Sequence, residues 1–295
     1  MQTILLIGLG KIGKSVAQTL LSQGKIVIGV TRHFTDIAQT LSQSPNFAHL
    51  QADASQLTPA QIQPFSQAIT HVCIIVSPSQ SSDQFTTQAY QAQAYKNSYL
   101  AICETIARLS PHLPRLQRVV FISSTSIYGH NSGEVIDATT PMQSPPSATA
   151  KILLQAEMVL AQQFGEKCTL IRPSGIYGRD RLRLIKMVEN LANGTMALPP
   201  NSWTNRIFDT DLIKIIVNVL NENQPLPVYL ATDNLPVPLY EVLGWLAGEM
   251  ALRVALPTTR PIGGKRLCHN LPEGWLEYGD FKQGYRVALE HFSVQ

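Results

Sequence analysis

The sequence has few cysteines, few charged residues and no run of basic side chains. Its four cysteines are Cys73, Cys103, Cys168 and Cys268. They are widely spaced and form no Cys-x-x-Cys pair, so the sequence predicts neither a metal site nor a disulfide framework. Charged residues make up 15% of the chain, with 23 Lys and Arg against 20 Asp and Glu. This small positive excess gives no reason to expect nucleic acid or a membrane as a partner.

Long apolar runs are also missing. The first run, Ile4 to Ile7, is too short to span a membrane and lacks the charged start and cleavage site of a secretion signal. We therefore expect a cytoplasmic protein. The chain has 295 residues, of which 44% are hydrophobic, and this is enough to bury a sizeable core.

Short apolar runs alternate with helical patterns in the first half of the chain. The strand candidates are nearly continuously apolar, as expected for parallel strands covered on both faces. A helix is expected from Lys11 to about Gln23, and a long one from about Asp83 to Leu109. This alternation predicts an α/β fold with a doubly wound parallel sheet. The strand candidates are Thr3 to Ile7, Ile26 to Val30, His49 to Ala52, Val72 to Val76, Val119 to Ile122 and Cys168 to Ile171.

The second half is less regular. Residues 129–147 are rich in Gly, Asn, Ser and Pro and predict a loop of the size found at active sites, followed by a helix to about Phe164. The last 120 or so residues mix short helices with Pro-rich connections. We predict a nucleotide-binding domain over residues 1–172 and a smaller mixed C-terminal substrate lobe over residues 173–295, interleaved with the first.

A glycine-rich motif, Gly8-Leu9-Gly10-Lys11-Ile12-Gly13, follows the first strand and opens the first helix. In this context it predicts a dinucleotide site in a Rossmann-type sheet. Gly8 permits a tight turn, Gly10 lets the backbone approach a pyrophosphate and Gly13 allows close packing of helix on strand. The helix N-terminus favours phosphates. The alternative is a glycine-rich turn that binds nothing.

Three further residues fit a dinucleotide site. Arg32, at the end of the second strand, stands where an NAD-selective enzyme usually has an acid, and it favours NADP over NAD by pairing with a 2′-phosphate. It could also be a surface arginine, with Asp36 nearby as a competing acid. Asp53 could contact adenine or cap a helix. Ser77, after the fourth strand, is expected beside the nicotinamide-proximal ribose.

The chain resembles the extended, or atypical, short-chain dehydrogenase/reductase superfamily, which includes NAD-dependent epimerases and dehydratases. The resemblance covers nearly the whole length. Beyond the glycine motif, it lies in a long-helix segment, a strand-end motif and three later segments. These are Asn97 to Glu104, Phe121-Ile122-Ser123-Ser124-Thr125-Ser126-Ile127-Tyr128-Gly129, Ile171 to Arg179, Asn205 to Asp211, and Lys265 to Tyr285.

The resemblance implies catalytic roles for Ser124, which would hydrogen-bond a substrate oxygen, and for Lys151, which would also hold the nicotinamide ribose. The superfamily places a Tyr four residues before this Lys, but here Ser147 stands there. A serine hydroxyl is a far weaker acid than a phenol, so the standard proton transfer is in doubt. A water between Ser147 and Lys151, or an acidic group on the substrate, could supply the proton.

The resemblance also implies a substrate side. Tyr128 or Tyr177 could present a hydroxyl in place of the missing Tyr, although both belong to motifs whose tyrosines usually pack in the core. His130 lies in the right loop to face a substrate, but a loop histidine is more often solvated. The other expected substrate contacts are Thr125, Ser174, Arg179 and Arg206, of which the arginines, with Arg183, could bind a phosphate or carboxylate or be ordinary surface charge.

Two functions remain open from the sequence. The first is an NAD(P)-dependent oxidoreductase or epimerase acting by hydride transfer on a small polar or sugar-nucleotide-like molecule. The second is a catalytically inactive NADP-binding sensor or regulator, suggested by Ser147. A homodimer through a four-helix bundle, made from the helices that end at Leu109 and begin at Ser147, is a further expectation from the resemblance.

Overall fold

A computed structural model describes residues 2–78 and 87–292 of the chain. The chain divides into two compact units, and each is described by itself. Unit 1 comprises residues 1–127, 144–172 and 216–228, and unit 2 comprises residues 128–143, 173–215 and 229–295. The predicted domain boundary between residues 172 and 173 is also a boundary between these units. Two segments are exceptions to this division. Residues 128–143 precede the boundary but belong to unit 2, and residues 216–228 follow it but belong to unit 1.

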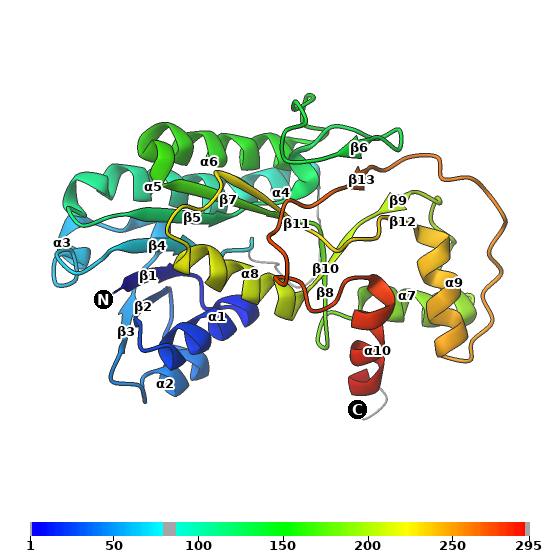
Figure 1. Ribbon diagram of the computed structural model, residues 1–295, viewed down its shortest axis with the longest axis horizontal. Helices are drawn as coiled ribbons and strands as arrows, with labels where there is room; N and C mark the ends of the chain where they lie inside the picture. The colour runs from blue at the N-terminus through cyan, green and yellow to red at the C-terminus, as the bar shows by residue number, and fades with distance from the viewer. Residues whose placement is uncertain (1, 79–86, 293–295) are drawn as a thin grey trace. The chain divides into compact units, whose positions relative to one another are not determined.

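A seven-stranded sheet forms the centre of the fold (Figure 1). Its strand order is β11-β7-β5-β4-β1-β2-β3, and every pair from β7 to β3 is parallel. This confirms the predicted doubly wound α/β fold. The strands are β1 (Thr3–Ile7), β2 (Ile26–Thr31), β3 (Phe47–Gln51), β4 (His71–Ile74), β5 (Arg118–Ile122), β7 (Cys168–Pro173) and β11 (Val228–Ala231).

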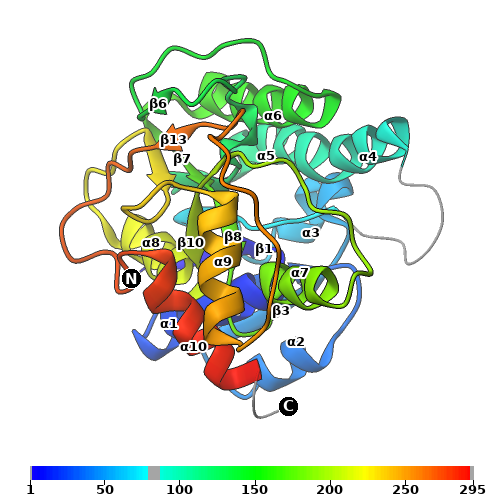
Figure 2. The same cartoon turned by 90° about the vertical axis from the view of Figure 1, so that its right-hand side faces the viewer.

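The apolar run of the first strand forms β1, which lies inside the sheet between β4 and β2. Thr3 pairs with Ile26 of β2, and Ile4 pairs with His71 of β4, so the carboxyl ends of these strands lie at the same edge. All five residues of β1 are buried. Figures 1 and 2 show α4, α5 and α6 on one face of the sheet and α1 and α2 on the other. Helices on both faces explain why the strand is apolar on both sides.

The helices of unit 1 begin close to the predicted positions, but the long helix is not regular. A π-helical turn, Lys96–Leu100, separates α4 from α5. The predicted start at Asp83 lies outside the described residues. The α-helices that lie wholly in this unit are α1 (Lys11–Ser22), α2 (Asp36–Leu41), α3 (Pro59–Ile62), α4 (Gln88–Tyr95), α5 (Ala101–Leu109) and α6 (Ala148–Phe164).

A buried ion pair joins α6 to β7. Arg172 donates to both carboxylate oxygens of Glu157, at 3.1 Å from Nε and 2.6 Å from Nη2. Both side chains are buried. Because a bidentate guanidinium–carboxylate pair fixes the distance and orientation of its partners, it sets the place of α6 against the sheet.

Unit 2 is built from two-residue and three-residue strands and from helices that pack around aromatic side chains. Its strands are β6 (Val135–Ile136), β8 (Gly175–Tyr177), β9 (Trp203–Thr204), β10 (Arg206–Phe208), β12 (Val237–Pro238) and β13 (Arg266–Leu267). Its helices are α7 (Arg183–Ala192), α9 (Leu239–Glu249) and α10 (Phe281–Phe292), and α8 (Asp209–Asn221) runs from unit 2 into unit 1. The core of unit 2 includes Tyr177, Phe208, Phe281 and Tyr285.

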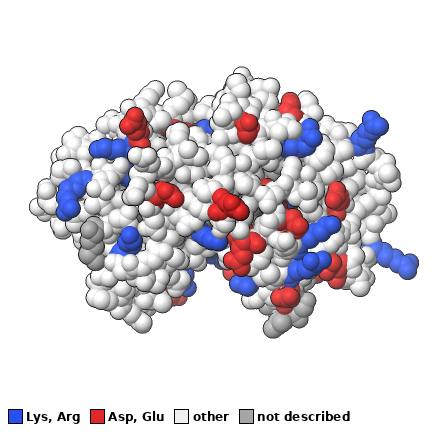
Figure 3. Space-filling view, viewed as in Figure 1, with Lys and Arg blue, Asp and Glu red and all other residues white. Residues whose placement is uncertain are grey.

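The surface agrees with the modest charge of the sequence. On the face shown in Figure 3, acidic and basic side chains of the described residues are interspersed, and neither sign forms an extended patch. Within the described ranges, no helix combines the length and apolar character that crossing a membrane requires.

Candidate functional site

The glycine motif forms a tight loop between β1 and α1. Gly8 has a backbone φ angle of +98°, which residues other than glycine rarely adopt. A Cβ atom on Gly13 would lie 1.9 Å from the carbonyl oxygen of Gly8, so this position also requires glycine. Gly10 is different, because a Cβ atom there would meet no protein atom within 4 Å. The open space above Gly10 is what a ligand that approaches the start of α1 needs.

A cavity of about 1080 Å³ lies at the carboxyl ends of the central strands, within unit 1. The loops after β1, β2, β3 and β4 line it, and so does one side of the helical segment formed by α4 and α5. Ligand pockets usually measure roughly 300–1,000 Å³, so this one has room for a dinucleotide. In the strand order of the sheet, β1 and β4 flank the point where the order reverses, and doubly wound sheets bind ligands there.

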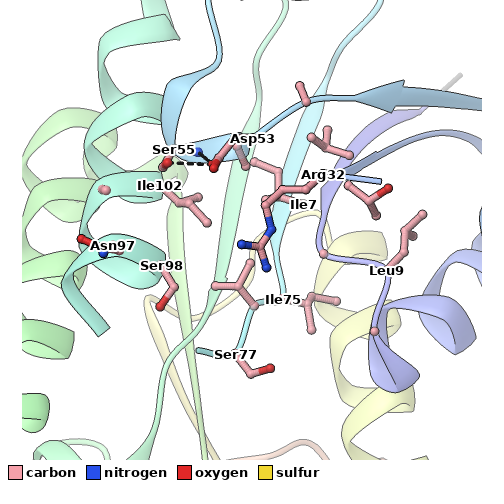
Figure 4. Close-up of a pocket in the computed structure, with 18 of the residues that line it drawn as sticks. Ile7, Leu9, Arg32, Asp53, Ser55, Ile75, Ser77, Asn97, Ser98 and Ile102 are labelled. Carbon is pink, nitrogen blue, oxygen red and sulfur yellow. Dashed lines mark hydrogen bonds between the residues drawn. The ribbon is translucent and has the colours of Figure 1, made fainter. Parts of the chain in front are cut away.

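Three of the predicted cofactor residues line this cavity together with Gly8, Leu9 and Gly10 of the glycine motif. The three residues are Arg32, Asp53 and Ser77. Figure 4 shows the Arg32 guanidinium group pointing into the cavity, between Asp53 and Ser77 in this view. The structure thus brings these side chains to one site, as a dinucleotide would require.

Asp53 also caps a helix, which is the second possibility that the sequence left open. Its Oδ1 atom accepts hydrogen bonds from the backbone N–H of Ser55, at 2.9 Å, and from the Ser55 hydroxyl, at 2.7 Å. These bonds begin the 3-10 helix Ala54–Gln56. The carboxylate is therefore held in place at the rim of the cavity by its own turn.

Sequence reasoning missed one wall of the cavity. This wall is the side of α4 and α5 that carries Tyr90, Gln93, Ala94, Asn97, Ser98, Ala101 and Ile102. Asn97 was noted only through the family resemblance. The spacing i, i+3, i+4, i+7 marks one helix face and could have identified the stripe. Its mixed polar and apolar character resembles an ordinary solvated face, and so the sequence alone gave no sign of a ligand.

The strand-end motif places Ser124 and Thr125 directly after β5. The backbone N–H of Ser123 donates to the carbonyl of Ile171, 2.8 Å away, and Ser124 Oγ accepts from the backbone N–H of Ser126 at 3.1 Å. Thr125 is buried in the short turn that follows, and this turn packs against α6. Lys151 is exposed in the second turn of α6. Ser124 and Lys151 thus belong to the same unit and to neighbouring elements.

Ser147, at the place of the missing Tyr, has a structural role. Its side-chain oxygen accepts a hydrogen bond from the backbone N–H of Ala150, at 3.1 Å, and lies 2.9 Å from the Thr149 hydroxyl. Ser147 is therefore the N-cap of α6, a position at which serine is strongly preferred. The residue suits the start of a helix and supplies no phenol.

The two tyrosines considered as replacements are buried side chains of unit 2. Tyr128 is fully buried, and the ring of Tyr177 packs 4.3 Å from Tyr285 and 5.2 Å from Phe208. Burial raises the pKa of Tyr177 well above that of a free phenol. Both side chains are buried, and a substrate contact of either hydroxyl stays a prediction.

The expected arginine cluster is not a cluster of exposed side chains. Arg179 and Arg183 are exposed, but Arg206 is 4% exposed. Arg206 donates to Thr204 Oγ1 at 2.8 Å, and its guanidinium group lies over the ring of Phe281. The Arg206 side chain is thus enclosed within unit 2, and its contact with a substrate stays a prediction.

Two more predicted residues are buried in unit 2. The Ser174 hydroxyl donates to Thr232 Oγ1 at 3.1 Å, and Ser174 is buried. Its predicted substrate contact also stays a prediction. His130 is also buried, contrary to the solvated position that the sequence favoured. Among the residues that were expected to contact the substrate, Arg179 alone has an exposed side chain. Thr125, which belongs to unit 1, is buried like the others.

Comparison with known families gives the assignment. A sequence model of the NAD dependent epimerase/dehydratase family matches residues 4–229. The chain belongs to this family. The matched range covers the positions of the glycine motif, the strand-end motif and Lys151. A comparison with curated proteins gave no match.

Several solved structures share the fold. A protein of Methylobacillus flagellatus, described as a candidate NAD-dependent epimerase/dehydratase, is 26% identical with a TM-score of 0.76, over 99% of both chains. UDP-glucuronic acid 4-epimerase of Bacillus cereus, in complex with NAD, is 16% identical with a TM-score of 0.74, over 99% of both chains. A dTDP-glucose 4,6-dehydratase of Streptomyces venezuelae, with NAD bound, is 16% identical with a TM-score of 0.73, over 100% of this chain and 98% of that one.

Proposed function

We propose that this protein binds NADP, or NAD, in the cavity of unit 1 and uses it for hydride transfer on a small polar or sugar-nucleotide-like substrate. The observation that carries the proposal is the open space at Gly10, at the start of α1 and at the edge of a cavity large enough for a dinucleotide. Gly8, Gly10, Lys11, Ile12 and Gly13 would hold the pyrophosphate through the loop backbone and the α1 N-terminus.

NADP is favoured over NAD by the charge at the end of β2. Arg32 lines the cavity at the position where a ribose 2′-hydroxyl or 2′-phosphate is expected. A guanidinium group pairs well with phosphate and poorly with the ribose of NAD. In calorimetric titrations, Arg32→Ala should weaken NADPH binding and leave NADH binding nearly unchanged. Equal losses for both cofactors would contradict the preference.

Each catalytic residue would have a separate task. The Ser124 hydroxyl would donate a hydrogen bond to the substrate oxygen, and the Lys151 ammonium group would bind the nicotinamide-proximal ribose, with Ser77 beside it. The cofactor, when bound, supplies the hydride donor or acceptor. Because Ser147 caps α6 and is a weak acid, the proton would come from a water held by Lys151 or from an acidic group on the substrate.

The proposal is tested by turnover. The purified chain, with cofactor binding shown separately, is offered a panel of nucleotide sugars and small carbonyl compounds. Net oxidation or reduction is followed by the absorbance of reduced nicotinamide, and epimerised or dehydrated products, whose formation regenerates the cofactor, are followed by chromatography. We expect turnover on at least one class of substrate, and a loss of roughly 100-fold or more in Ser124→Ala, as for removal of one hydrogen-bond donor to a reacting oxygen. Ser126→Ala, an exposed serine of the same turn, is the matched control. No turnover across the panel with cofactor bound would contradict it.

A catalytically inactive NADP sensor is the second candidate, and the capping role of Ser147 favours it. A sensor would bind cofactor as tightly in Ser124→Ala as in the wild type, and cofactor would change its affinity for a protein partner. A loss of turnover in Ser124→Ala would exclude this candidate.

A homodimer through α4, α5 and α6 stays a prediction from the resemblance. Met158, on α6, is 50% exposed, which is consistent with a contact on this face. The mass of the protein in solution tests it, and a monomer at micromolar concentration would contradict it.

A further inference from the structure

We infer that one buried water molecule bridges Arg206 and Asp233, and that this bridged pair makes the interior of unit 2 respond to pH. The inference is independent of the proposed cofactor site, because both residues belong to unit 2 and the cavity lies within unit 1. The two residues are neighbours in the fold, since the backbone N–H of Asp233 donates to the carbonyl oxygen of Arg206 at 2.7 Å.

Both ionisable side chains are enclosed, and each leaves one atom unsatisfied. Arg206 is 4% exposed and Asp233 is 2% exposed. Among the described residues, neither Nη1 of the guanidinium group nor Oδ2 of the carboxyl group has a hydrogen-bond partner, and both atoms are buried. A buried polar atom without a partner costs free energy, and most such atoms in proteins are paired with protein or with ordered water. These two atoms therefore call for a hydrogen-bonding group.

Other contacts hold the two side chains in place. Arg206 Nη2 donates to Thr204 Oγ1 at 2.8 Å, and the guanidinium carbon lies 5.7 Å from the centre of the Phe281 ring. Asp233 Oδ1 accepts a hydrogen bond from the backbone N–H of Leu235 at 3.3 Å. Each group is thus tied to neighbours of its own, and Nη1 of Arg206 and Oδ2 of Asp233 do not meet directly.

The chemistry of the two atoms selects the bridging molecule. The guanidinium nitrogen Nη1 can only donate a hydrogen bond, and the carboxylate oxygen Oδ2 of ionised Asp233 can only accept one. A single molecule that serves both must therefore accept and donate. An anion would be repelled by the carboxylate and a cation by the guanidinium group, so the molecule is neutral. Water meets these conditions and is small, and buried water molecules typically make about three hydrogen bonds to polar groups of this kind.

The pH response follows from the ionisation of Asp233. Burial raises the pKa of Asp233 to about 7, and the charge of Arg206 opposes this rise. The bridge therefore joins opposite charges above neutral pH, and a neutral acid and a cation below it. His269 contacts the adjacent Asn234 and stays neutral, because burial lowers its pKa. The other titratable groups that act on Asp233 are Asp211 of α8, Asp280 just before α10, and the phenols of Tyr177 and Tyr285, which burial keeps neutral.

Two measurements on the full chain test the inference. A crystal structure with ordered solvent, from crystals grown above neutral pH, tests the bridge. We expect one water molecule within hydrogen-bonding distance of Arg206 Nη1 and of Asp233 Oδ2. A direct contact between the two side chains, or protein partners for both atoms, would overturn the bridge. Carboxyl-carbon NMR tests the pH response, with the Asp233 resonance identified by its loss in Asp233→Asn.

The NMR titration compares the wild type with Arg206→Met and with the control Arg253→Met, an exposed arginine of the same unit. Arg206→Met should raise the pKa of Asp233 by about 1 or more, since an adjacent arginine lowers an aspartate pKa by roughly 1 to 3, and Arg253→Met should leave it unchanged. An unchanged value in folded Arg206→Met would overturn the coupling. If no aspartate of the wild type titrates near neutral pH, the pH response is wrong whether or not the variants fold. None of these outcomes depends on cofactor binding, so the proposed function stands or fails separately.

Discussion

The Ser147 side chain accepts a hydrogen bond from the backbone N–H of Ala150, 3.1 Å away, and so begins the helix that carries Lys151. The chain therefore uses the position of the usual tyrosine to cap a helix. This relationship connects a local rule of helix formation with the chemistry that the site can perform.

The capping role predicts a stability effect that depends on the hydrogen-bond acceptor. Ser147→Ala should lower the free energy of unfolding by about 1 kcal/mol, while Ser147→Asp, which keeps an acceptor at the N-cap, should stay within a few tenths of the wild type. Urea unfolding measures both. The account would be contradicted by an alanine variant as stable as the wild type, or by an aspartate variant as unstable as the alanine one.

The buried pair of Glu157 and Arg172 predicts a much larger effect. Glu157→Gln leaves the Arg172 guanidinium buried without its charged partner, and breaking a buried pair from one side costs roughly 3–5 kcal/mol. Glu166→Gln, an exposed residue just after the same helix, is the matched control and should be neutral. The midpoint of urea unfolding reports the change. A cost below about 1 kcal/mol would mean that the pair does not fix α6 to β7.

His71 predicts a loss of stability in acid. Burial, with Arg118 and Lys25 adding to it, lowers the pKa of His71 to about 4. The folded pKa lies below the unfolded value of 6.5, so the contribution of His71 to stability is complete above pH 6.5 and is lost as the pH falls towards 4. The free energy of unfolding of the wild type should therefore fall more steeply over this window than that of His71→Gln.

Another buried group titrates in the opposite direction and has to be separated from His71. Burial raises the pKa of Asp233 to about 7, so its contribution to stability is complete below pH 3.8 and is lost as the pH rises towards 7. Asp233 is present in both proteins, and the difference between wild type and His71→Gln cancels it. Parallel pH profiles for the two proteins would show that His71 does not carry the effect.

The sequence predicted the sheet well because buried parallel strands are apolar on both faces. β1 has the predicted limits, but β3 begins two residues earlier than expected, at Phe47. Its limits are set by pairing with β2, where Phe47 lies opposite Val27, and not by its own hydrophobicity. The π-helical turn at Lys96–Leu100 was not predicted, because it changes hydrogen bonding within a helix and leaves no mark on the pattern of apolar residues.

The residues that line the cavity of unit 1 were easier to predict than the burial of the polar side chains of unit 2. Gly8, Gly10 and Arg32 line the cavity because they lie in the loops that follow β1 and β2, and the sequence marks the start of these loops. Tyr177 and Arg206 are enclosed by Phe281 and Tyr285, which follow them by more than seventy residues. Such long-range packing decides which polar side chains are exposed, and a single sequence does not contain it.

The central claim is that the glycine loop of unit 1 binds a nicotinamide dinucleotide. Its most direct test is calorimetric titration of NADPH into the wild type and into Gly10→Ala, with Gly13→Ala for comparison. A methyl group on Gly10 meets no protein atom, so Gly10→Ala should stay folded and lose only about 1 kcal/mol or less, the cost of alanine at the N-cap of α1. Gly13→Ala should be destabilised more, by the contact with Gly8.

Wild-type protein should bind NADPH. Gly10→Ala should bind it roughly 5- to 150-fold more weakly, as expected for a methyl group forced into a close contact, beyond the loss of about 1 kcal/mol or less in folding stability from alanine at the N-cap of α1. If the wild type binds neither NADPH nor NADH, or if folded Gly10→Ala binds NADPH as tightly as the wild type, the glycine loop is not a dinucleotide site and the account is wrong.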